Sequence, residues 1–270
     1  MEQRNQPESA SFEAWLRTTH GPAHSRRTAE RNAAFLLPHL GPGMRLLDAG
    51  CGPGSITIGL ARAVAPGEAV GIDASEEAIA AARQRATADS CANVRFEVAD
   101  ASALPYEDGS FDAVFAHALL QHLPWPLDAL VELRRVLKPG GVIGVADADM
   151  EGALLAPESD ALARGADIMR RMRHNPRVGR HLRGLLHNAG FARVEASATA
   201  GARGDAASVK LDGEWNARYF EAEPMIAQAE SRGWATRVEM VEIASAWRAW
   251  ANDPGAFSAA FWCQAVGWAP

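Results

Sequence analysis

The segment Leu46–Ser55, with the sequence LLDAGCGPGS, most strongly limits what this chain can fold into. Its apolar first half is typical of a buried strand. Glycines at alternate positions, Gly50, Gly52 and Gly54, let the backbone turn sharply where that strand ends. The residues that follow, Ser55–Val64, have the Ala, Leu and Ile content of a helix. A strand, a glycine loop and a helix in this order bring backbone N–H groups close to a ligand, so the sequence predicts a ligand site at this loop.

Strand-like and helix-like segments alternate around this loop and beyond it. Because the strands are almost continuously apolar, we expect a parallel sheet covered on both faces, in a doubly wound α/β domain. The expected strands are Met44–Ala49, Ala69–Ile72, Val94–Val98, Ala113–Ala116 and Val142–Ala146. The expected helices are Thr28–Leu40, which should end near Pro38, then Ser55–Val64, Glu76–Ala88 and Leu127–Leu137.

The pattern changes to long helical segments after Met150. Helix signals predict helices over Glu158–Met172, Arg177–Ala189, Glu214–Arg232 and Arg237–Trp250. Two strand-like runs, Ala192–Ala198 and Phe257–Val266, could extend the sheet, and Ala198–Ala207 is interpreted as a mobile loop. We therefore expect an N-terminal cap segment at 1–25, an α/β core at 26–150, a mainly helical region at 151–250 in which 190–199 return to the sheet, and a final strand within 251–270.

Composition narrows the classes of partner. The 270 residues have a formal net charge of −6, whereas a surface that follows nucleic-acid phosphates is normally basic, so we expect no nucleic-acid partner. No apolar run is long enough to span a membrane and the N-terminus lacks a signal-peptide core, so we expect a cytoplasmic protein without a membrane partner. The three cysteines, Cys51, Cys91 and Cys263, are too few and too widely spaced for a disulfide framework, and we interpret them as reduced.

Acidic residues near the strand ends indicate the kind of ligand. Asp48 precedes the glycine loop, where a carboxylate would repel a pyrophosphate but attract an ammonium group. Asp73 ends the second strand, where it can accept hydrogen bonds from two ribose hydroxyls. Asp100 follows the third strand and can accept from an adenine amino group. Together these carboxylates describe a ligand with a cationic end and a nucleoside end.

Four runs, LLDAGCGPG, VGIDAS, VADASALPYEDGSFDAVFAHALLQHL and LRRVLKPGGVIGVAD, follow one another in this order over residues 28–150. With them the chain resembles the class I S-adenosylmethionine-dependent methyltransferases. The resemblance is greatest to the branch of quinone-biosynthesis C-methyltransferases and small-molecule methyltransferases of secondary metabolism. It implies a Rossmann-like seven-stranded sheet of order 3-2-1-4-5-7-6, with an antiparallel last strand at Phe257–Val266 and a helical lid.

The resemblance implies S-adenosylmethionine as cofactor and assigns its binding residues. Gly50, Cys51, Gly52 and Gly54 would surround the methionine part, and Asp48 would orient its ammonium group. The remaining contacts would be Asp73 and Ala74 at the ribose, Asp100 and Ala101 at the adenine, Ala116 and His117 at the sulfonium, and Arg27 at the methionine carboxylate.

Catalytic and acceptor-binding residues are less sharply indicated. His20, His24 and His117 are weak candidates for a general base, and Trp15, Asp147, Met150 and Tyr219 are candidates for acceptor binding. His20 and His24 have a spacing that can bind metal, but no third ligand has recognisable spacing, so we expect no metal.

These observations predict an enzyme that methylates a C, N or O atom of a small aromatic or apolar metabolite. Two alternatives stay open: a non-catalytic regulator or scaffold that binds the cofactor, and, less favoured by the glycine spacing, an NAD(P)-dependent oxidoreductase. A homodimer through the helical region also stays open.

Overall fold

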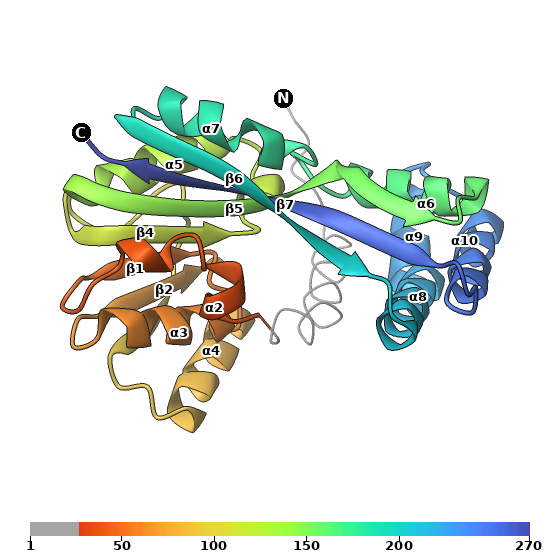
Figure 1. Cartoon of the computed structure of the whole chain (residues 1–270), viewed down its shortest axis with the longest axis horizontal. Coiled ribbons are helices and arrows are strands. Elements are labelled where there is room, and N and C mark those ends of the chain that lie inside the picture. The colour runs from red at the N-terminus through yellow and green to blue at the C-terminus, as the bar shows by residue number, and fades with distance from the viewer. Residues whose placement is uncertain (1–26) are drawn as a thin grey trace. The chain divides into compact units, whose positions relative to one another are not determined.

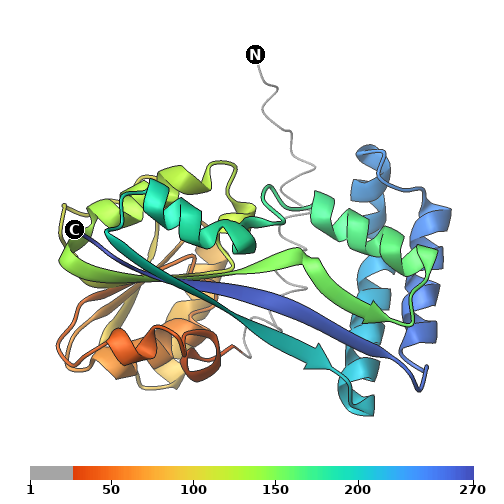
Figure 2. The ribbon, with the colours of Figure 1, turned by 45° about the horizontal axis from the view of Figure 1, so that its top comes forward.

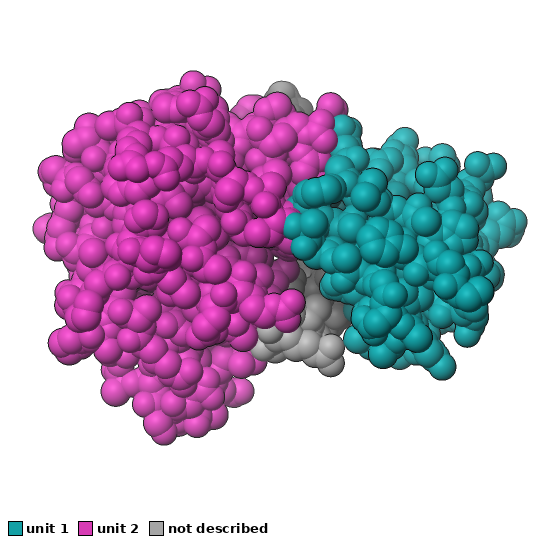
Figure 3. Space-filling model, viewed as in Figure 1, with its two compact units in different colours: residues 1–22, 150–173, 200–261 teal, residues 23–149, 174–199, 262–270 magenta. Residues whose placement is uncertain are grey.

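The structure is a computed structural model and describes residues 27–270 (Figure 1). The described chain divides into two compact units (Figure 3). The sheet unit comprises 27–149, 174–199 and 262–270, and the helical unit comprises 150–173 and 200–261. No helix in the described chain is both long enough and apolar enough to cross a membrane.

Seven strands form one sheet in the order β3-β2-β1-β4-β5-β7-β6, which confirms the expected topology. The pairs β1–β2, β1–β4, β2–β3 and β4–β5 are parallel. Strand β7 is antiparallel, because its end meets the beginnings of both neighbours: Ala269 O accepts from Gly140 N, and Trp268 O accepts from Ala192 N. The strands are β1 (Leu46–Ala49), β2 (Ala69–Asp73), β3 (Val94–Val98), β4 (Phe111–His117), β5 (Leu137–Ala156), β6 (Arg193–Arg203) and β7 (Phe257–Trp268).

Helices cover both faces of the sheet, as the apolar strands require (Figures 1 and 2). One face packs α5 (Pro126–Arg135) and α7 (Val178–Asn188) in a core that contains Leu133 and Leu186. The opposite face packs the helices α2 (Ala29–Asn32), α3 (Ser55–Val64) and α4 (Glu76–Ala88). The two single-turn 3-10 helices of this unit are η1 (Leu37–His39) and η2 (Leu120–His122).

The helical unit has its own core. Its buried side chains include Tyr219, Phe220 and Trp250, and the Trp250 indole N–H donates to Ala156 O at 2.7 Å. Thr236 and Glu239 form a capping box at the start of the last helix, so that helix begins where the sequence predicts. The helices are α6 (Asp160–Arg171), α8 (Ala206–Glu221), α9 (Glu223–Ser231) and α10 (Arg237–Trp250).

Two expected helices are wrong in extent. The helix expected over Thr28–Leu40 is only α2, which ends at Asn32 and is followed by turns and the 3-10 turn that contains Pro38. Proline has no N–H to continue an α-helix, which explains why the second half is not α-helical. The helix expected over Glu214–Arg232 is two helices, α8 and α9, because Ala222 is extended and Pro224 occupies the first turn of α9.

Three further segments differ from what the sequence predicts. The mobile loop expected over Ala198–Ala207 is the second half of β6 and the start of α8. Strand β5 extends well beyond the expected Val142–Ala146. Residues 174–199, most of which were placed in the helical region, belong to the sheet unit, because α7 buries Leu182 and Leu186 in the sheet's core. One division between the two units falls between Asp149 and Met150.

Candidate cofactor site

The glycine loop connects the end of β1 to the start of α3, at the carboxyl edge of the sheet. Gly50 N and Cys51 N both donate to Ile72 O at 2.8 Å, which fixes the loop against β2. Gly54 has a φ of 73°, and a Cβ added there would lie 2.8 Å from Phe96 Cζ. Both the backbone conformation and the packing therefore require glycine at the start of α3.

Gly52 is the open position of this loop. Its φ of 52° also favours glycine, but a Cβ added there would meet no atom of residues 27–270 within 4 Å. Leu119 and Phe96 pack closely beside Gly50 and Gly54, so the loop is closed at both ends and open in its middle. A ligand can approach the backbone closely at Gly52.

Asp48 is a buried carboxylate directly before the loop, with 2% of its surface exposed. Its Oδ2 accepts a hydrogen bond of 2.6 Å from Thr57 Oγ1, in the first turn of α3. Burial raises the pKa of Asp48 to about 7; within this value the Thr57 hydrogen bond acts to lower the pKa and the charge of Asp73 acts to raise it. A cation bound near the loop would favour the ionised carboxylate.

Asp73 ends β2 with both carboxylate oxygens directed at backbone N–H groups. Oδ2 accepts from Gly52 N at 3.0 Å and Oδ1 accepts from Ser75 N at 2.9 Å. Each carboxylate oxygen has a second lone pair, so the group can accept two further hydrogen bonds from a ligand. The neighbouring Ala74 is exposed.

Asp100 and Ala101 follow β3 at the same edge of the sheet. Asp100 is exposed, and its Oδ1 accepts from Ser102 N at 2.8 Å, whereas Ala101 is buried in the core against the sheet. The turn after β3 thus offers one solvated carboxylate beside an apolar surface.

His117, the last residue of β4, belongs to a cluster of polar and aromatic side chains. Its ring stacks on Trp262 of β7, with centroids 4.5 Å apart, and its Nε2 lies 3.2 Å from Asn32 Nδ2 at the end of α2. The Arg27 guanidinium lies 5.5 Å from the centroid of the Trp262 ring. Burial lowers the pKa of Arg27 to about 10, and the charge of Asp147 counteracts this. Ala116, which precedes His117, is fully buried.

Asp147 lies on β5, one residue beyond Ala146, which pairs with His117. The side chain is completely buried, and Oδ2 accepts from Leu120 N at 2.8 Å. Within the described chain, Oδ1 is buried without a hydrogen-bond partner. Burial raises the pKa of Asp147 to about 7, against nearby backbone N–H groups and the charge of Arg27. A buried carboxyl with such a pKa can hold or release a proton near neutral pH.

The structure brings most predicted site residues to one edge of the sheet unit, around the ends of β1 to β5. Met150 and Tyr219 belong instead to the helical unit, where Tyr219 is 1% exposed, stacks on Trp215 and donates to Met172 Sδ. Trp15, His20 and His24 lie outside the described residues.

Three residues that contact predicted site residues were missed from the sequence: Thr57, Asn32 and Trp262. Thr57 is nine positions from Asp48, in the first turn of a helix that the sequence does predict. A hydroxyl at that position could have indicated a hydrogen bond to the carboxylate before the loop. Nothing in the sequence indicates that Trp262 meets His117, because β4 and β7 are far apart along the chain and the sheet order places only β5 between them.

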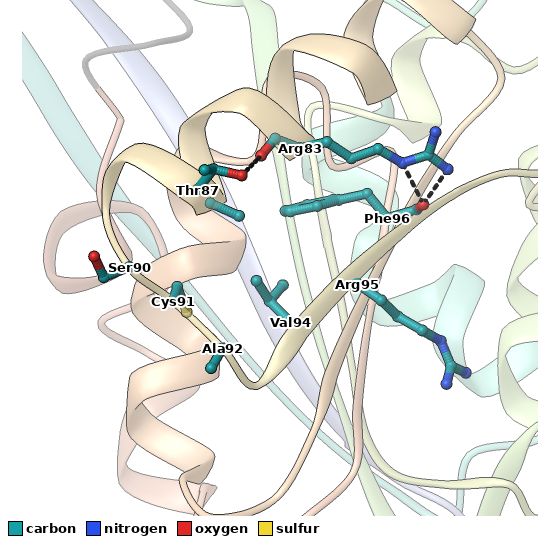
Figure 4. Close-up of a pocket in the computed structure, with 9 residues that line it drawn as sticks. Arg83, Thr87, Ser90, Cys91, Ala92, Val94, Arg95 and Phe96 are labelled. Carbon is teal, nitrogen blue, oxygen red and sulfur yellow. Dashed lines mark hydrogen bonds between the residues drawn. The ribbon is translucent and has the colours of Figure 1, made fainter.

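A separate open hollow of about 500 Å³ lies between α4 and β3 and is lined by residues that include Arg83, Cys91 and Phe96 (Figure 4). None of the predicted site residues within 27–270 lines it. Across residues 27–270, no group of three or more His, Cys, Asp or Glu side chains is placed to hold a metal ion.

Comparisons with known proteins agree with this geometry. Residues 40–190 match the methyltransferase domain family. An uncharacterized methyltransferase of Schizosaccharomyces pombe is 30% identical over 246 residues, which cover 85% of this chain and 86% of that protein. A demethylmenaquinone methyltransferase of Staphylococcus aureus is 44% identical over 102 residues, which cover 37% of this chain and 42% of that enzyme.

A solved structure has the same fold. The Haemonchus contortus phosphoethanolamine N-methyltransferase 2, in complex with phosphomonomethylethanolamine and S-adenosylhomocysteine, superposes with a TM-score of 0.56 at 20% identity. The superposition covers 89% of this chain and 53% of that one. At this identity the likeness supports the fold alone.

Proposed function

Because this chain belongs to the class I S-adenosylmethionine-dependent methyltransferases, we propose that it methylates a carbon, nitrogen or oxygen atom of a small aromatic or apolar metabolite. S-adenosylmethionine is the methyl donor of this family, and when bound it supplies a methyl group activated by a sulfonium centre.

The residues around the glycine loop fit the donor's chemistry. The open middle of the loop at Gly52 admits the methionine part, and the buried Asp48 supplies negative charge for its ammonium group. The two carboxylate oxygens of Asp73, already oriented by backbone N–H groups, would accept from the ribose hydroxyls. The exposed Asp100 offers a polar contact for the adenine, and the buried Ala101 offers an apolar one.

The observation that best supports an aromatic acceptor is the stack of His117 on Trp262 at the end of β4. Flat aromatic side chains favour flat ligands, and the neighbouring Arg27 would attract an anionic or electron-rich ring. The Staphylococcus aureus relative is named for demethylmenaquinone, a quinone, which agrees with an acceptor of this class.

Two side chains can handle the acceptor's proton. The buried carboxyl of Asp147 has a pKa near 7, which suits proton transfer at neutral pH. His117 already contacts Asn32 through Nε2, which orients the ring. We therefore favour Asp147 over His117 as the proton acceptor. Such a group adds about 10²–10⁴-fold to the rate when the acceptor must lose a proton.

Calorimetric titration with S-adenosylhomocysteine tests the donor site. The full chain should bind it, and Asp73→Asn should weaken binding by about 10- to 100-fold through the loss of charge-assisted hydrogen bonds. Asp89→Asn is the matched control, because it removes one carboxylate charge next to α4, outside the proposed site, and should leave binding unchanged. Unchanged affinity in Asp73→Asn would refute the ribose assignment.

Turnover decides between an enzyme and a cofactor-binding regulator. We would measure the formation of S-adenosylhomocysteine from S-adenosylmethionine with a panel of phenols, hydroquinones and aromatic amines. One of these acceptor classes should support turnover. Asp147→Asn should lower the rate with that acceptor while leaving S-adenosylhomocysteine binding intact. Binding without turnover on this panel would favour the regulator.

A further inference from the structure

The sheet has two edges, formed by β3 and β6, and the chain protects them differently. At β3, the Arg83 side chain donates to Phe96 O from Nε at 3.2 Å and from Nη2 at 2.7 Å, so a backbone acceptor of that edge is already used (Figure 4). Unpaired backbone groups on an edge strand are a template for a further strand, and a side chain that occupies them blocks this pairing.

Strand β6 shows no such contact on its outer edge in the described chain: Arg203 donates to Ala202 O at 3.2 Å, but even-numbered residues of this strand face β7. Ten of its eleven residues are exposed, and only Val194 is buried. Its sequence, RVEASATAGAR, contains neither proline nor lysine, and the stretch between Glu195 and Arg203 consists of small residues. Natural edge strands of this length are usually shielded, so a strand exposed on its outer edge and on both faces indicates a surface that another strand covers.

The direction of the backbone groups defines which residues would pair. Ala192 N donates to Trp268 O, so it faces β7. Successive residues of a strand direct their N–H and C=O groups to opposite edges. The odd-numbered residues of β6, among them Thr199 and Gly201, therefore direct these groups to the open edge.

The charged residues of β6 would face residues of opposite charge if two copies of the strand paired antiparallel. If two copies pair antiparallel about a two-fold axis at Thr199, Glu195 lies opposite the partner's Arg203. In the same register Arg193 lies opposite the partner's Asp205, just beyond the strand. All these positions are odd-numbered, so they fall on hydrogen-bonded pairs. A two-fold axis makes each attraction occur twice, as an isologous interface requires.

We infer that β6 is a dimer interface, through which two copies of this chain join their sheets antiparallel with Thr199 at the centre. Backbone hydrogen bonds provide the affinity and the paired charges set the register. We expect assembly to stop at two copies, because each copy uses its β6 edge in the pairing and Arg83 holds a backbone acceptor of the other described edge, at β3.

Sedimentation equilibrium of the full chain over a range of concentrations tests the interface. The wild-type chain should be a dimer, and Glu195→Arg should raise its dissociation constant about tenfold by placing like charges opposite each other twice. Arg203→Glu should do the same, and the double variant Glu195→Arg/Arg203→Glu should restore dimerisation. As a matched control, Arg237→Glu removes an exposed ion pair with Glu223 in the helical unit and should leave the dimer unchanged.

A backbone variant tests the edge independently of charge. Gly201→Pro removes an N–H group on the open edge without removing one that faces β7, so it should give a monomer, whereas Gly201→Ala should stay dimeric. Thermal unfolding of every variant is followed in parallel, because the charge of Arg203 also acts on the partly buried Asp212. A wild-type monomer at all concentrations, or a dimer insensitive to Gly201→Pro, overturns the interface. Failure of the double variant to restore a dimer weakened by both single variants overturns the register.

Discussion

The buried Asp48 carboxyl lowers the stability of the folded chain at neutral pH, and the variant Asp48→Asn measures by how much. The carboxyl is 2% exposed, and its single described hydrogen bond comes from Thr57. Asparagine has nearly the same shape and keeps a carbonyl oxygen that can accept from the Thr57 hydroxyl. The substitution therefore removes the ionisation and leaves the packing close to unchanged.

The size of the effect follows from the pKa. Burial raises the pKa of Asp48 from 3.8 to about 7, and one unit corresponds to 1.36 kcal/mol. Below pH 4 the carboxyl is protonated in both folded and unfolded chains. Between pH 4 and pH 7 the unfolded chain releases the proton while the folded chain keeps it, so the wild-type free energy of unfolding falls as pH rises. Above pH 7 the raised pKa of Asp48 therefore lowers the wild-type free energy of unfolding by about 4 kcal/mol.

Urea unfolding of the wild type and Asp48→Asn at several pH values between 4 and 8 is the assay. Relative to its value at pH 4, the stability advantage of Asp48→Asn should grow by about 2–4 kcal/mol by pH 8. Other titrating groups, including Asp147, are common to both chains and cancel in the difference. A difference that stays constant across this range would refute the buried, perturbed carboxyl.

Thr57→Val should act in the opposite direction. It removes the hydroxyl that stabilises the ionised carboxylate, so its instability relative to the wild type should increase as pH rises through 7. Cofactor binding should show the complementary effect. Because an ammonium group favours ionised Asp48, wild-type affinity for S-adenosylhomocysteine should increase between pH 6 and pH 8, and Asp48→Asn should bind more weakly with less of this dependence.

The remaining predictions concern packing. Gly54→Ala should lower the free energy of unfolding by about 1–3 kcal/mol, because its Cβ would approach Phe96 at 2.8 Å. Gly52→Ala carries the strain of its positive φ but no such clash, so it should lose less stability while weakening S-adenosylhomocysteine binding. Urea unfolding and calorimetry separate the two effects, and equal stability losses would contradict the geometry. Trp250→Phe should lower stability by about 1–2 kcal/mol, because it leaves the Ala156 carbonyl without its indole donor. No change in the urea midpoint would contradict this contact.

The helices and strands with strong local sequence signals were predictable. Helices α3, α4 and α10 have the expected bounds, because the residues that start and end them lie in the helix or directly beside it in the sequence. Proline and extended residues interrupt the helices at places where the apolar pattern continues, which explains the wrong extents near Pro38 and Pro224.

The glycine loop was also predictable from the local sequence, because a strand, three glycines and a helix determine where the backbone turns. The sequence by itself thus determined the order of the elements, the family and the position of the glycine loop. Only the tertiary structure decided that Trp262 stacks on His117, that Thr57 holds Asp48, and that β6 lies exposed at an edge. Such contacts depend on which strands become neighbours and how side chains meet across them, and no periodicity along a single chain segment encodes that choice.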